Sequence, residues 1–170
     1  MWKKTLAILA AFYLFAFLQN SFFAHFYLFG AGINLVFILF FLLLFYSSPM
    51  APNYRSVLLA SFAGFFLDVF SHTHIGPSML ILVVGTLLFR KTQLLLRNRE
   101  ETYPFFYFLP LFLIFFLFYT LLLGFYFSFF DQSGIAFVSV WNIFWQVIYN
   151  TMVASAVFYI CKKIKHGKNL

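Results

Sequence analysis

One stretch of this chain gathers residues whose side chains could do chemistry. Between residues 61 and 78, Asp68 stands inside an apolar run, and His72, His74 and Gly76 follow in a short turn. An ionisable residue within an apolar span is a candidate functional site, as a proton relay or a cation ligand. Alternatively, its carboxylate accepts backbone N–H groups of the turn or of the next helix, where the helix dipole favours an anion. We favour this second, structural role, in which Asp68 fixes a helical hairpin.

The two histidines form a His-x-His pair, which by itself is a weak metal-binding pattern. A metal site requires at least one further ligand, and His25 and Asp131 are the side chains that could supply it in space. His72 also lies four residues after Asp68, so the two share a face if the helix continues for one more turn. We favour polar turn residues over ligands and predict no metal site.

The rest of the chain offers no catalytic pattern. It contains no Gly-x-Ser-x-Gly, no His-Glu-x-x-His and no P-loop. Only 4 of its 170 residues are acidic, and Glu100 and Glu101 lie in a hydrophilic segment. The single cysteine, Cys161, excludes an intrachain disulfide and a cysteine-based metal site. We therefore expect no enzyme, no catalytic residue and no cofactor.

Composition assigns the chain to the membrane. It is 64% hydrophobic and 25% aromatic, and only 9% of its residues are charged, against about 25% in a soluble domain. Its mean hydropathy is +0.96. The net charge of +7 comes from short basic clusters beside apolar runs, a pattern of membrane orientation. We therefore predict contact with the lipid bilayer and no nucleic-acid binding.

Six apolar runs predict an all-α integral membrane protein that forms one domain over residues 1–170. The hydrophilic residues 90–103 are expected to form a separate amphipathic helix on the membrane surface. The third and fourth spans form a helical hairpin around the Asp68 turn. The six predicted spans cover residues 5–23, 33–46, 56–70, 75–89, 105–130 and 138–160.

The distribution of Lys and Arg predicts the orientation of these spans. With both termini in the cytoplasm, all 11 Lys and Arg residues fall in the cytoplasmic segments. The three outer loops then contain none, as the positive-inside rule requires. Five spans would place one of the two terminal basic clusters outside, so we predict six spans with cytoplasmic termini.

Small and amide residues mark where helices are expected to meet. Gly64 lies one turn before Asp68 on the same predicted face, and a small residue there lets two helices approach closely. Gln19, Asn34 and Asn150 lie at span level, where interhelical hydrogen bonds contribute roughly 0.6–2 kcal/mol each.

Several of these residues occur in an order and spacing that resemble the MreD family of bacterial rod-shape-determining proteins. The family's first span tends to end in Leu-Gln-Ser/Asn, as residues 18–21 do here. Its third span carries Gly-(x)3-Asp and then a Ser/Gly-rich turn, which corresponds to Gly64, Asp68, Ser71 and Gly76. A basic cluster follows the fourth span, and an Asn occupies the last span.

Two matches concern amide residues. The Asn near the middle of the family's last span corresponds to Asn150. Where the family tends to have Pro-Asp-Leu at the start of the second span, this chain has Asn34 between Ile33 and Leu35. The acid is absent, so any role of an acid there is not carried over. The resemblance makes Gly64, Asp68, Ser71, Gly76, Gln19, Asn34 and Asn150 a structural and assembly motif.

The resemblance implies a function in cell elongation. MreD-like proteins are non-enzymatic scaffolds of the bacterial inner membrane that bind MreC, a single-span protein. Through that complex, the elongasome, they support rod shape and lateral peptidoglycan synthesis, linked indirectly to MreB and to peptidoglycan synthases. The fold is similar to the six-helix substrate-binding subunit of energy-coupling-factor transporters. The alternative function is therefore a small-molecule, vitamin-type binding subunit of a transporter.

Overall fold

The computed structural model describes residues 2–25, 32–47, 53–71, 74–100, 104–130 and 140–167. These residues form six α-helices and one short 3-10 turn, and they contain no strand, so the predicted all-α class is confirmed for them. The elements are α1 (Trp2–Ser21), η1 (Phe23–His25), α2 (Leu35–Phe45), α3 (Asn53–Phe70), α4 (Pro77–Glu100), α5 (Pro104–Phe130) and α6 (Val140–Gly167).

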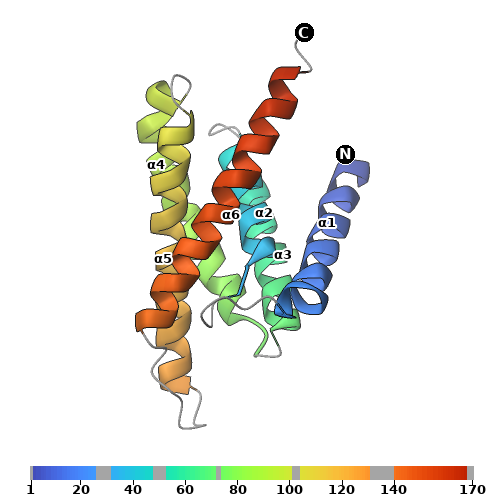
Figure 1. Cartoon of the computed structure of the whole chain (residues 1–170), viewed down its shortest axis with the longest axis vertical. Coiled ribbons are helices and arrows are strands. Elements are labelled where there is room, and N and C mark those ends of the chain that lie inside the picture. The colour runs from blue at the N-terminus through green and yellow to red at the C-terminus, as the bar shows by residue number, and fades with distance from the viewer. Residues whose placement is uncertain are drawn as a thin grey trace.

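Successive helices run in alternate directions, so that the start of α1 and the end of α6 lie toward the same end of the bundle, at the top of Figure 1. Three helical segments are long and apolar enough to cross a membrane, namely Pro77–Leu95, Phe105–Phe130 and Trp141–Lys163. The apolar segments Thr5–Ser21 and Leu35–Phe45 are shorter. The count of six spans therefore stays a prediction.

The expectation of a helix on the membrane surface over residues 90–103 is wrong for the part that the structure describes. Residues 90–100 do not form a separate surface helix, because they continue α4 without a break as far as Glu100. The fourth membrane span is predicted to end at residue 89, because Arg90 and Lys91 begin the hydrophilic segment. Instead, Arg90 and Gln93 turn inward and are only 4% and 0% exposed. The last helix also extends beyond residue 160, to Gly167.

Helix α2 is the centre of the bundle although it is the shortest α-helix of the described chain. It has 11 residues, of which eight are buried, and it packs against α1, α3 and α6. At 1.5 Å per residue it is about 16 Å long, roughly half the thickness of a bilayer's hydrocarbon core. Its apolar sequence is explained by burial on most sides, with Leu35, Leu39 and Leu43 forming one partly exposed face.

Two ladders of phenylalanine hold α2 against α5. Phe37, Phe41 and Phe45 of α2 recur every four residues and therefore share one face. They meet a second ladder of the same spacing on α5, so the ring centroids of the antiparallel helices pair in register. The pairs are Phe37 with Phe116 at 4.9 Å, Phe41 with Phe112 at 5.2 Å and Phe45 with Phe108 at 5.2 Å. Each such pair contributes about 0.5–1.5 kcal/mol beyond the burial of its area.

Helices α3 and α4 form the predicted hairpin and cross closely at Gly64. A β-carbon on Gly64 would overlap the backbone of Met79 near the start of α4. Ala60, one turn earlier on α3, is fully buried, so this face of α3 carries small residues where α4 approaches. Gly64 therefore sets the distance between the two helices.

We expect Gly64→Ala to lower the free energy of unfolding by about 1–3 kcal/mol, because the new methyl group meets backbone that cannot rotate away. Denaturant titration in detergent micelles would measure this loss. Gly85→Ala on α4 is the matched control, since the three atoms nearest to its methyl group would be side-chain ring atoms, two of Phe115, the closer at 2.9 Å, and one of Phe118 at 3.4 Å. An equal loss in both variants would contradict the close crossing.

Candidate functional site

The carboxylate of Asp68 is the hydrogen-bond acceptor for the start of α4. One oxygen accepts the N–H of Gly76 at 2.8 Å and that of Met79 at 3.4 Å, and the other accepts the N–H of Ser78 at 3.0 Å. Asp68 is 1% exposed. This is the second of the two arrangements considered for Asp68 from the sequence. We call these contacts the Asp68 cap.

The local sequence explains why the cap forms here. Gly76 has φ of +130°, a conformation that other residues rarely adopt. Pro77 is the first residue of α4, where its missing N–H and its fixed φ do no harm. The turn thus aims the free N–H groups of α4 back at α3. The helix dipole favours a negative charge at that point, and hydrogen bonds to a charged acceptor are among the stronger ones.

Neighbouring polar groups complete the Asp68 cap. The hydroxyl of Ser71 donates to the backbone carbonyl of Asp68 at 3.1 Å. The hydroxyls of Ser78 and Tyr119 lie 3.1 Å apart and are both buried, which ties the start of α4 to α5. No Lys or Arg of the described residues forms an ion pair with Asp68, so hydrogen bonds and the helix dipole hold it there.

A second polar cluster, the α2 cap, holds the start of α2. The Asn34 side chain accepts the N–H of Phe37 at 3.0 Å, as an N-cap residue does. Asn150 of α6 is fully buried; its side-chain oxygen accepts the N–H of Asn34 at 2.6 Å and its amide donates to the carbonyl of Gly32 at 3.0 Å. Gln19 of α1 accepts the N–H of Val36 at 3.4 Å. Amide groups from three helices therefore meet at one helix start.

The opposite end of α2 is held in the same way. Ser47 donates through its hydroxyl to the carbonyl of Leu44 at 2.6 Å, and Gln93 of α4 donates to that of Phe45 at 3.2 Å. The guanidinium of Arg90 donates to the Ser47 hydroxyl at 3.2 Å. A cation is favourable at a helix C-terminus, where the dipole is negative. Both ends of this short helix are thus hydrogen-bonded by side chains from other helices.

The seven residues singled out from the sequence divide between the two caps. Gly64, Asp68, Ser71 and Gly76 belong to the α3–α4 hairpin. Gln19, Asn34 and Asn150 meet at the start of α2. No hydrogen bond between described residues joins the two groups, so they do not converge on one cavity. Their role in assembly stays a prediction.

The histidines give no support to a metal site. His25 and His74 are exposed, and the described residues contain no group of three or more ligands that could hold a metal. His72 and Asp131, the other two candidates, lie outside the described residues.

Sequence analysis missed the polar face of α4. Thr86, Arg90 and Gln93 are spaced by four and three residues, which places them on one face of a continuous helix. All three are buried. Because the fourth span was predicted to end before Arg90, the helical spacing of these three residues was not recognised.

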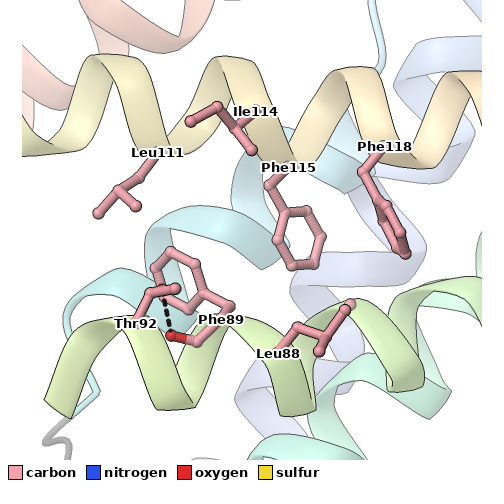
Figure 2. A pocket seen from close by; sticks show the side chains of 8 residues that line it. Leu88, Phe89, Thr92, Leu111, Ile114, Phe115 and Phe118 are labelled. Carbon is pink, nitrogen blue, oxygen red and sulfur yellow. Dashed lines mark hydrogen bonds between the residues drawn. The ribbon is translucent and has the colours of Figure 1, made fainter. Parts of the chain in front are cut away.

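The structure has an apolar groove on the outside of α4 and α5, with a volume of about 180 Å³. Leu88 and Phe89 of α4 face Leu111, Ile114 and Phe115 of α5 across it (Figure 2). Thr92 is the only polar side chain among the described residues of its lining, and its hydroxyl donates to the carbonyl of Phe89 in the same helix at 2.7 Å. The groove therefore offers no group for chemistry and is suited to an apolar partner.

Substitution of Asp68 tests the Asp68 cap. Asp68→Asn keeps one acceptor oxygen and is expected to fold with a loss of about 1–3 kcal/mol. Asp68→Leu leaves three N–H groups without an acceptor and is expected to cost several kcal/mol and to disrupt assembly. Unfolding titrations and complementation of a deletion strain would measure both effects. Full activity and wild-type stability in both variants would contradict the role of this residue.

The α2 cap is tested by Asn150→Leu, which keeps the branched shape with a larger side chain and removes three hydrogen bonds, the third being to the carbonyl of Gln146 in the same helix at 2.8 Å. We expect the free energy of unfolding to fall by about 1–3 kcal/mol. Asn142→Leu is the matched control, because Asn142 lies on the same helix but is exposed. Its effect should stay within about 0.5 kcal/mol. A similar result for the two variants would show that the cap contributes nothing measurable.

Comparison with known proteins identifies the family. The family model described as "rod shape-determining protein MreD" matches residues 3–164, nearly the whole chain. No curated protein and no solved structure matches the chain. The matched family is a non-catalytic, shape-determining one, and three apolar helices of spanning length mark a membrane protein. On this match over nearly its full length, the chain belongs to the MreD family.

Proposed function

We propose that this chain is a non-enzymatic scaffold of the bacterial cell-elongation complex, which binds an MreC-type protein and supports rod shape and lateral peptidoglycan synthesis. The observation that carries the proposal is the family match over residues 3–164, nearly the whole chain. In this proposal MreB and the peptidoglycan synthases are indirect partners, reached through the same complex.

The proposal places the chain in the inner membrane with six spans and both termini in the cytoplasm. All 11 Lys and Arg residues are cytoplasmic in that topology. The end of the bundle at which α1 starts and α6 ends would then face the cytoplasm (Figure 1). The Asp68 cap and the α2 cap would lie toward the outer side, because α2 and α4 both start there.

An MreC-type partner would contribute a single apolar span, and the groove between α4 and α5 is the surface that we assign to it. None of the described residues that line the groove is charged. Leu88 and Ile114 at its rim are 52% and 64% exposed, so a neighbouring helix can reach them. Van der Waals packing on such a surface is the main attraction between helices in lipid.

The filled core favours a scaffold over a vitamin-type binding subunit. Phe37, Phe41, Phe112 and Phe116 fill the space between α2 and α5 and are fully buried. Asp68, which a polar ligand pocket would have used, is 1% exposed and already accepts three N–H groups. The proposed likeness to the six-helix transporter subunit therefore concerns architecture and not ligand binding.

The experiment is co-purification of the full chain with an MreC-type protein, combined with depletion in a rod-shaped cell. We expect a stable complex, and rounded cells on depletion. Ile114→Trp should weaken the complex, because the larger side chain fills the groove at its rim. Met152→Trp is the matched control, since Met152 is also exposed, at 66%, but lies on α6.

The outcomes separate the function from the surface. Normal rod shape after depletion, together with a partner-free protein, would contradict the proposed function. A complex that survives Ile114→Trp and is lost in Met152→Trp would leave the function intact and move the contact surface to α6.

A further inference from the structure

A second groove, between α1 and α3, combines apolar walls with a polar end. It has a volume of about 480 Å³. Its walls are the apolar side chains of Ile8, Leu9, Leu58, Leu59 and Phe62. Thr5, Tyr54 and Arg55 line its other part and all belong to the first turns of the two helices.

The groove is closed at one end and open at the other. Ring contacts join the helices beyond it, between Phe12 and Phe66 at 6.3 Å and between Tyr13 and Phe70 at 6.0 Å. Toward its first turns, α1 stands away from the rest of the bundle (Figure 1). The result is a wedge whose closed, apolar end lies at mid-helix and whose open, polar end lies at the start of both helices.

Among the described residues that line the groove, the charged one, Arg55, lies at the open end. The guanidinium of Arg55 lies 5.9 Å from the ring centroid of Tyr54, and both side chains are exposed. Lys3 is also exposed, near the start of α1 and five residues before Ile8. The starts of α1 and α3 add two positive helix dipoles at the same level. In the predicted orientation this is the cytoplasmic interface, where anionic lipid headgroups lie and where each Lys or Arg contributes about 1 kcal/mol to their binding.

We propose that this groove binds one acyl chain of an anionic phospholipid, with the lipid phosphate held by Arg55. An acyl chain is narrow enough to end at the closed, apolar end of the wedge. A partner helix about 10 Å wide would instead need an open face along both helices, which the contact of Tyr13 with Phe66 at 6.4 Å interrupts. A partner helix would also gain nothing from a cation at one end only.

The test is native mass spectrometry of the full chain in detergent, titrated with phosphatidylglycerol or with phosphatidylcholine of the same acyl chains. We expect the wild type to retain phosphatidylglycerol preferentially. Arg55→Gln should weaken retention of that lipid about fivefold. Leu9→Trp and Leu58→Trp should weaken retention of both lipids, because they fill the apolar part of the groove. Excess inorganic phosphate should displace neither lipid.

The matched controls are Lys91→Gln and Leu6→Trp, which change exposed residues outside the groove and should retain both lipids as the wild type does. Equal retention of the two lipids by the wild type would overturn the proposal. The same loss in Lys91→Gln as in Arg55→Gln would also overturn it, since any surface cation would then suffice. Unchanged lipid retention in both tryptophan variants, with loss of self-association or of a partner protein, would assign the groove to a protein contact instead.

Discussion

The structure depends on the requirement that both ends of α2 be hydrogen-bonded inside an apolar bundle. Each helix end carries backbone groups that the helix itself does not pair, and hydrocarbon offers them no water. A helix of 11 residues cannot place both ends at the membrane surfaces. Side chains from α1, α4 and α6 therefore bind α2 at its two ends. This one constraint explains why amides and a buried arginine occur in a chain with so few polar residues.

Side-chain packing then fixes the positions of the helices whose ends are hydrogen-bonded. The phenylalanine ladders of α2 and α5 recur with the same spacing and pair ring by ring. Their rings fill the centre of the bundle, so the high phenylalanine content has a structural purpose at these positions. Gly64 has the opposite role, because its lack of a side chain leaves room for the backbone of α4 to approach α3. The large phenylalanine rings and the small Gly64 therefore both help to position the α2 cap and the Asp68 cap.

Sequence analysis predicted the helical class, the hairpin and the polar residues of both caps, because an amide or an acid in an apolar run must find a partner. The partners of Asp68 were also among the expectations, but those of the amides were not, since Asn34 and Asn150 are 116 positions apart and nothing local relates them. The continuation of α4 beyond residue 89 was not predicted, because Arg90 begins a hydrophilic stretch whose composition is typical of a loop. The ladders were overlooked for another reason: among 30 phenylalanines, six with a regular spacing do not stand out.

The contact between Asn34 and Asn150 has a consequence for biosynthesis. Chain segments enter a membrane in the order in which they are made, yet α2 is bonded at its start by α6, the last helix of the described chain. The other end of α2 is bonded by Gln93 of α4, and its phenylalanines pack against rings of α5. Both of these helices are also made after α2. The second helix therefore cannot complete its contacts before α6 has been made. A chain that ends before α6 lacks the Asn150 side chain that binds the start of α2.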